Sequence, residues 1–475
     1  MGDEIEKQHF KKKDYLEFEQ RLLQETKLLH RLFFEQQFSD GQPMAGFEQE
    51  AWFVNSDCDP SPGIEAFIQN TKDSLVTPEL STFNIELNVE PMCLQGDVFS
   101  QLLGTFSDSM QAAQKTAALN NERIVMIGIL PTVNDSHLIL ENMSPLNRYH
   151  ALNEQVLHGR KGKPLNLDIV GEEHLQSQHM DVMLESAATS FQIHRQIPAS
   201  QARRYYNASI VVSAPMVAVA ANSPYLFGKH LWEESRIPLF EQAVEVGGFG
   251  SAAEGPVRRV SFGSGYAQQS ILECFDENLE HFPILLPMIL DQPPEDLAHL
   301  RLHNGTIWRW NRPLIGVNNG KFHLRTEHRT IAAGPTVVDE IANAAFFYGL
   351  QEYLANSEVA PELINTFSQV KDNFYQAARF GLQAQIYWDG KKQNLRHLIL
   401  NVLLPVARSG LQKLDIDAAD IEIYLGIIQA RVESQQNGAN WQKKYVNKNG
   451  RDWKALTQIY LDKQLTGEPV HSWRI

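Results

Sequence analysis

Cysteine and long apolar runs are both scarce in this 475-residue chain. Its three cysteines, Cys58, Cys93 and Cys274, lie far apart and form no CxxC pair. An odd, scattered set of this kind predicts reduced thiols rather than a disulfide framework. The most apolar stretch, residues 210–221, includes Pro215 and is shorter than the roughly 20 residues that a membrane-spanning helix needs. We therefore expect a cytoplasmic protein without a membrane partner.

Basic residues are also in the minority. The chain has 42 lysines and arginines against 57 acidic residues, which gives a formal net charge of −15. Because a nucleic-acid-binding surface usually shows as a basic patch, we expect no nucleic-acid partner. An acidic enzyme can still bind small anions such as nucleotides, provided that metal ions and local arginines reverse the field at the site. The polar N-terminus argues against a secretory signal.

The common nucleotide and nucleophile motifs are missing as well. The sequence contains no GxxxxGK[ST], so a P-loop is not supported. The glycine-rich stretch at 247–255 follows no clear strand, which argues against a dinucleotide-binding turn and predicts a mobile loop. A nucleophile elbow of the GxSxG type is absent, and residues 262–266 resemble one only superficially. Any nucleotide chemistry must therefore rest on another arrangement.

Acids, amides and histidines do occur on alternate positions in four short segments. These are residues 46–53, 83–90, 191–197 and 322–329. A strand points successive side chains to opposite faces, so alternation places the polar groups of each segment together. In the second segment one face is apolar, and the other carries Asn84, Glu86, Asn88 and Glu90. The pattern predicts strands with one acid-lined face.

The other three segments would add charged groups to the same face. The first supplies Glu48 and Glu50, the third His194, and the fourth Glu327 and Arg329. Unit charges about 4 Å apart repel by roughly 4 kcal/mol at an effective dielectric near 20, so bare carboxylates would not gather there. Magnesium ions bind carboxylate oxygens and phosphates, and two or three of them would remove this penalty. We therefore predict a metal-lined sheet that binds a nucleotide.

Each group on its own has a simpler interpretation. A Glu-x-Glu pair on a strand is usually a solvated face, and a lone His194 is more often structural than a metal ligand. Arg309 and Arg312 fit surface ion pairs equally well. The ordered combination of these groups on strands is what favours a site.

The remaining sequence predicts an α+β fold with no clear domain boundary. We expect a single domain over 1–475, with an N-terminal helix within 1–40 and a mainly helical part at 337–475. Gly334-Pro335 should begin a helix, with the proline in its first turn. The other expected elements are helices near 14–38, 98–120 and 199–221 and a buried strand at 122–131.

Several blocks of sequence resemble one known family. Residues 323–339 are similar to the strand of the glutamate–cysteine ligase type 2, or carboxylate–amine ligase, family that ends in Glu-x-Arg and runs into a helix. This family belongs to the glutamine-synthetase-like superfamily. Further blocks that resemble it follow the family order, at 46–50, 85–88, 221–224 followed by 235–236, 311–313, 377–382 and 436–442. The resemblance covers the chain from about residue 40 to about residue 445.

The resemblance implies a curved antiparallel sheet that holds magnesium (or manganese) and ATP, the co-substrate. It also implies an ATP-dependent ligase of glutathione biosynthesis. Such an enzyme activates a carboxylate, usually the γ-carboxylate of glutamate, as an acyl phosphate, and an amine, with cysteine as a candidate, then forms the amide. By the same resemblance the metal ligands would be Glu48, Glu50, Glu79, Glu86, His194 and Glu327.

The resemblance also implies roles for arginines and amides. Arg329 would neutralise the transferring phosphoryl group, and Arg312 and Glu327 would act beside it. Cofactor or substrate contacts are implied for Arg309, Arg329, Asn88 and Asn222. The chain has Gln192 where the family often has a histidine, so the acceptor amine is left open.

Two other functions stay open on the sequence alone. One is a nucleotide-binding regulatory protein that keeps the fold without turnover, and the other is a metal-dependent hydrolase that needs no ATP. The Glu327-x-Arg329 pair favours phosphoryl transfer, because simple hydrolysis needs no such arginine. In every case the partners are small molecules, and a homo-oligomer is left open.

Overall fold

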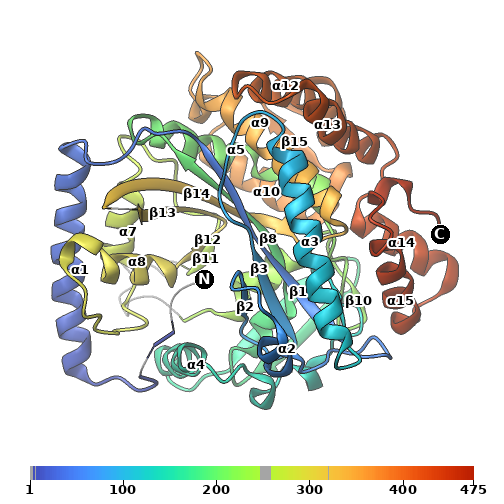
Figure 1. Ribbon diagram of the computed structural model, residues 1–475, viewed down its shortest axis with the longest axis horizontal. Helices are drawn as coiled ribbons and strands as arrows, with labels where there is room; N and C mark the ends of the chain where they lie inside the picture. Colours follow the sequence, from blue (N-terminus) through green and yellow to red (C-terminus); the bar gives the residue numbers. More distant parts are fainter. Residues whose placement is uncertain (1–3, 6, 247–257, 319) are drawn as a thin grey trace.

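A computed structural model describes residues 4, 5, 7–246, 258–318 and 320–475 (Figure 1). The loop predicted at 247–255 lies outside the described residues. At the centre is an antiparallel sheet in the order β13-β14-β8-β1-β3-β2, with β4 and β5 also paired to β1. Its strands are β1 (Met44–Val54), β2 (Val76–Pro78), β3 (Asn84–Asn88), β4 (Met92–Cys93), β5 (Arg123–Val125), β8 (Ser190–Ile197), β13 (Asn311–Asn318) and β14 (Lys321–Ala332).

The strand register brings together residues from distant parts of the sequence. Glu50 in β1 is paired with Glu86 in β3. His194 in β8 lies between Gly46 of β1 on one side and Glu327 of β14 on the other. The four segments with alternating polar groups therefore form neighbouring strands of one curved sheet, as predicted.

The opposite face of the sheet belongs to the main hydrophobic core. Phe47, Ile85, Leu87, Phe191 and Ile193 are buried in it. Helices α5 and α9 pack together, with α5 against β14 and α9 against β8. The helices are α1 (Lys12–Phe34), α2 (Ile64–Asn70), α3 (Val98–Ala118), α4 (Asn147–Gly159), α5 (Ala202–Ala220), α6 (Arg236–Ala243), α7 (Glu273–His281), α8 (Ala298–Gly305), α9 (Val337–Ala355), α10 (Phe367–Phe380), α11 (Leu395–Leu398), α12 (Leu404–Lys413), α13 (Ala418–Glu433), α14 (Gly438–Asn449) and α15 (Trp453–Gln464).

Short two-stranded sheets complete the α+β fold, and the chain after β14 is mainly helical, as predicted (Figure 1). These strands are β6 (Leu165–Val170), β7 (His174–His179), β9 (Tyr225–Leu226), β10 (Lys229–His230), β11 (Val260–Ser261), β12 (Trp308–Arg309), β15 (Gln385–Trp388) and β16 (Lys391–Asn394). In the described part of the chain, no helix combines the length and the apolar character that crossing a bilayer demands.

The strand predicted at 122–131 is much shorter than expected. Only Arg123–Val125 pairs with β1, although the residues that follow are buried. Their carbonyls instead accept hydrogen bonds from side chains and, at Gly128, from the Thr189 backbone amide at 2.9 Å. Tyr460 Oη donates to the Met126 carbonyl at 3.0 Å, and Trp52 Nε1 donates to that of Ile127 at 3.1 Å. Tertiary contacts thus replace the ladder that hydrophobicity alone suggested.

The start of α9 also differs from the prediction. The helix begins at Val337, and Thr336 is its N-cap, so Pro335 lies before the helix rather than in its first turn. The Thr336 hydroxyl accepts a hydrogen bond from the Asp339 amide at 3.3 Å. A hydroxyl satisfies a free amide of the first turn, and a proline ring offers no acceptor for it, which is why the threonine caps the helix.

Two glycines allow α9 and α12 to cross closely. A Cβ atom added to Gly410 would lie 1.9 Å from the Gly349 carbonyl oxygen. We expect Gly410→Ala to destabilise the protein by about 1–3 kcal/mol or more, because backbone atoms cannot give way as a side chain can. Gly426, in α13, has no atom within 4 Å of its added Cβ among the described residues. Gly426→Ala is therefore the control, and it should be neutral or stabilising in chemical denaturation.

Candidate active site

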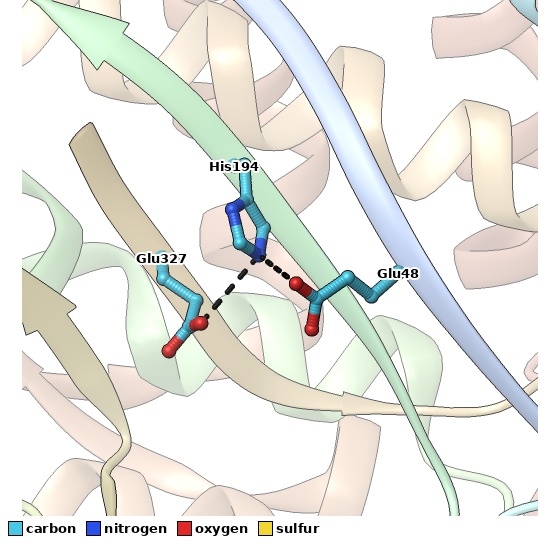
Figure 2. Close-up of side chains that lie close together, drawn as sticks. All are labelled: Glu48, His194 and Glu327. Carbon is cyan, nitrogen blue, oxygen red and sulfur yellow. Dashed lines mark ion pairs between the residues drawn. The ribbon is translucent and has the colours of Figure 1, made fainter. Parts of the chain in front are cut away.

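Three predicted ligands converge from three adjacent strands. Figure 2 shows His194 of β8 between Glu48 of β1 and Glu327 of β14. His194 Nε2 lies 3.4 Å from Glu48 Oε1 and 3.5 Å from Glu327 Oε1. One ligand atom from each side chain lies within 4.8 Å of the others. We call these residues the histidine cluster.

A second group consists of acids alone. Glu50 of β1, Glu86 of β3 and Glu79, just after β2, place carboxylate oxygens within 4.8 Å of one another, and all three are buried. We call them the triple-acid cluster. Glu48 and Glu50 belong to different clusters because residues two apart on a strand are separated by about 7 Å. The six residues predicted as ligands thus form two neighbouring groups.

Burial works against charge on most of these acids. Burial, together with the charge of Glu86, raises the pKa of Glu48 to about 7. Burial also raises the pKa of Glu50 and raises that of Glu79 well above its ordinary value. The carboxylates of Glu48, Glu50 and Glu79 therefore favour protons, or another cation, in the folded protein, whereas the pKa of Glu86 is lowered despite its burial.

His194 and Glu327 respond differently. Burial lowers the pKa of His194 to about 3, so its imidazole is neutral and keeps a lone pair for a metal. Burial alone would raise the pKa of Glu327, but Arg312 and Arg329 hold it well below its usual range. Arg312 donates to both Glu327 oxygens, at 2.7 and 2.9 Å. The two arginines therefore keep the Glu327 carboxylate of the histidine cluster ionised.

The raised pKa values predict a metal- and pH-dependent stability. Carboxyls with raised folded pKa values contribute stability that is fully present below about pH 4.5 and is lost as pH rises through about 7. Without metal, the melting temperature should therefore fall between about pH 6 and about pH 8.5. Magnesium or manganese should restore it, by on the order of 5 °C and more at the higher pH. Thermal melts with EDTA or metal test this. A metal-independent melting temperature at both pH values would contradict it.

Arg329 connects the two clusters. Its Nη1 lies 3.3 Å from Glu327 Oε2 and also donates to Gln192 Oε1. Gln192 Nε2 in turn donates to Glu50 Oε1 at 2.8 Å. The residue that replaces the family histidine thus holds an acid of one cluster and the arginine of the other. Arg312 and Arg329 both lie beside Glu327, and the roles predicted for them stay predictions.

Other predicted contacts have partners elsewhere. Arg309 Nη2 forms an ion pair of 2.7 Å with Glu277 of α7. The Asn222 amide donates to the Ala333 carbonyl at 2.7 Å and to the Tyr460 hydroxyl at 2.8 Å. Both arrangements link parts of the fold, and a ligand-binding role for Arg309 and Asn222 stays a prediction.

Asn88 and Glu90, which follow Glu86 in the sequence, have different surroundings. Asn88 Nδ2 donates to Glu86 Oε1 at 3.0 Å, so it positions an acid of the triple-acid cluster. Glu90 is exposed and lies past the end of β3, which corrects its assignment to the acid-lined face. The alternating pattern continues in the sequence for two residues after the strand has ended.

Sequence reasoning missed three charged residues near the clusters. Arg325 occupies the same alternating series as Glu327 and Arg329, so the strand pattern could have indicated it. Arg236 and Glu185 line a pocket with Glu50 and Arg329. Burial raises the pKa of Glu185 to about 8. Neither residue lies in a polar alternating segment. Arg236 belongs to a block that resembles the family, but that block did not indicate a role for it, and no local signal marks Glu185.

Solved structures with a similar fold are ligases. A glutamate–cysteine ligase from Francisella tularensis, in complex with AMP, is 12% identical, with a TM-score of 0.56 over 92% of this chain and 90% of that one. A bifunctional glutathione synthetase from Pasteurella multocida is 11% identical, with a TM-score of 0.52 over 94% of this chain and 55% of that one. No curated protein sequence gives a significant match. These likenesses establish the fold.

Family membership comes from the sequence match. The model of glutamate–cysteine ligase family 2 matches residues 44–461, and the chain belongs to this family. The protein is accordingly an ATP-dependent carboxylate–amine ligase. The match includes both acid clusters and the arginines between them.

Proposed function

We propose that the protein joins the γ-carboxylate of glutamate, or of a similar acid, to an amine through an acyl phosphate, with cysteine as the first candidate amine. The observation that carries this proposal is the pair of acid clusters linked by Arg329 and flanked by Arg312. Such a site can hold cations and a polyphosphate together while neutralising a phosphoryl group in transfer. The family and the fold support a role in glutathione biosynthesis.

The donor set fits magnesium or manganese. The clusters offer carboxylate oxygens and one neutral imidazole, whose buried Nε2 has no hydrogen-bond partner among the described residues. The histidine cluster would hold one ion. The triple-acid cluster would hold another. When bound, such ions neutralise phosphate oxygens and align them for in-line transfer.

The chain's own residues would then position the substrates and neutralise the phosphoryl group. Transfer of the terminal phosphoryl group of ATP to a carboxylate oxygen would give an acyl phosphate and ADP. Attack by a neutral amine nitrogen would expel phosphate and, after loss of a proton, leave the amide. Arg329 and Arg312, which both pair with Glu327, would face the region in which charge builds up on the phosphoryl oxygens. Gln192 keeps Arg329 aligned from the other side.

The decisive experiment measures ADP and phosphate release across a panel of amino-acid pairs, with and without cysteine. The proposal requires release that depends on both an acid and an amine. Thermal stabilisation by ATP without ADP release would instead indicate a nucleotide-binding regulatory protein. Turnover of a substrate without any nucleotide would indicate a metal-dependent hydrolase.

A further inference from the structure

A narrow pocket opens beside the triple-acid cluster. It is lined by carboxylates, guanidinium groups and two aromatic rings, and its cavity volume is about 10 Å³, which is room for one water-sized group. The lining residues are Glu50, Glu185, Ser190, Arg236, Phe240, Trp310 and Arg329, together with Ala188. The inference that follows rests on the proposed function.

The charges that line this pocket are already paired, except for one. Both oxygens of Glu50 accept hydrogen bonds, from the Ser190 amide at 2.7 Å and from Gln192 at 2.8 Å. Arg236 Nε lies 3.3 Å from Glu234. Arg329 is paired with Glu327, as described above. Among the described residues, the carboxylate of Glu185 has neither a hydrogen bond nor an ion pair, and this leaves one acid of the pocket without a partner.

The surroundings of Glu185 hold its backbone in place. It belongs to a short 3₁₀ helix (Met183–Ala187) whose other residues are buried. The Glu185 amide donates to the Val182 carbonyl at 3.0 Å, and the Ala188 amide donates to the Glu185 carbonyl at 3.1 Å. Its fixed turn limits the movement of this half-buried carboxylate toward solvent, so a group that enters the pocket would offset its desolvation.

The aromatic part of the pocket lining is also held in place. Trp310 Nε1 donates to Glu241 at 2.9 Å, and the Phe240 and Trp310 rings meet edge to face at 5.8 Å. The Arg236 guanidinium lies 5.2 Å from the centre of the Trp310 ring. Because Arg236 already covers the face of Trp310, Glu185 is the group of this pocket that a small cation would meet, and a primary ammonium group has the required size and charge.

The location identifies which substrate would carry this ammonium group. The pocket shares Glu50 with the triple-acid cluster and Arg329 with the linked arginines, so it adjoins the place where the carboxylate would be phosphorylated. An acid activated at its γ-carboxylate has its α-ammonium group at the opposite end. We propose that Glu185 binds the α-ammonium group of the amino-acid substrate whose side-chain carboxylate is activated, and thereby selects amino acids over plain dicarboxylates.

The test compares L-glutamate with glutarate, which lacks only the ammonium group. The wild-type protein should favour glutamate, measured as kcat/KM or as Ki if glutarate does not turn over. In Glu185→Gln, kcat/KM for glutamate should fall by roughly 10- to 100-fold. The constants for glutarate and the KM for ATP should change little. Glu141, which is exposed, provides the matched control Glu141→Gln, which should behave as wild type.

Two results would overturn the inference. One is a glutamate-to-glutarate ratio in Glu185→Gln equal to that of the wild type. The other, which needs no variant, is a wild-type protein that uses or binds glutarate as well as glutamate. If no acid and amine pair releases ADP, the proposed function has failed. In that case, the melting temperatures of the wild type and of Glu185→Gln are compared with glutamate and with glutarate. A stabilisation by glutamate over glutarate that is lost in the variant supports the role of Glu185, and one that is absent in the wild type or kept in the variant contradicts it.

Discussion

Replacing Glu327 by glutamine should reduce kcat by on the order of 10³-fold while the protein stays folded. The change is nearly isosteric, but it removes the charge that meets Arg312, Arg329 and the neutral His194. A bound cation would lose a carboxylate, and both guanidinium groups would lose their anchor. Steady-state ADP release measures the effect, and melting temperature reports the fold.

The matched control is Glu90→Gln, since Glu90 is exposed beyond the end of its strand. It makes the same chemical change outside both clusters and should leave kcat within about twofold. Turnover at the wild-type rate in Glu327→Gln would contradict a role for Glu327 in the reaction. Loss of metal-induced stabilisation in the same variant would show that the missing activity arises from the metal site.

Replacing Arg329 by alanine should lower kcat by about 10²- to 10³-fold. The guanidinium group links the two clusters because it contacts both Glu327 and Gln192. Among the described residues, no other side chain has a hydrogen bond or ion pair with both of them. Without it, charge that develops on the phosphoryl group would lose a buried donor. Lysine at this position should recover only part of the rate, because an ammonium group lacks the planar fork.

Arg31, exposed near the end of α1, supplies the control for this second variant. Arg31→Ala removes the same side chain far along the sequence from either cluster and should retain full activity. Single-turnover measurement of ADP formation separates phosphoryl transfer from product release. An unchanged single-turnover rate in Arg329→Ala would contradict the role proposed for this arginine.

The alternation of polar and apolar residues predicted the central strands well. The side-chain period of a strand is fixed by backbone geometry, so Glu48, Glu86, His194 and Glu327 could be assigned to polar faces from local sequence. Helices with a clear apolar stripe, such as Val98–Ala118, were predicted with small errors at their ends. The prediction of strands was wrong where hydrogen bonds from distant side chains replace backbone pairing, as at Met126.

The site was only partly predictable for a similar reason. Local pattern identified acids on strands, but it could not divide them into two clusters, since that depends on the register between strands. Gln192 appeared as a departure from a family pattern, and only the structure shows that it contacts both Glu50 and Arg329. Glu185 comes from a short turn without periodicity, so no sequence signal placed it beside the triple-acid cluster.

The sequence by itself determined the type of most elements, the polar face on which Glu48, Glu86, His194 and Glu327 lie, and the family, because backbone periodicity and ordered motifs are local properties of a chain. The tertiary structure decided which carboxylates meet, which arginine pairs with them and which acid lines the neighbouring pocket. Those outcomes depend on strand order and on burial, and both arise only when segments hundreds of residues apart pack against each other.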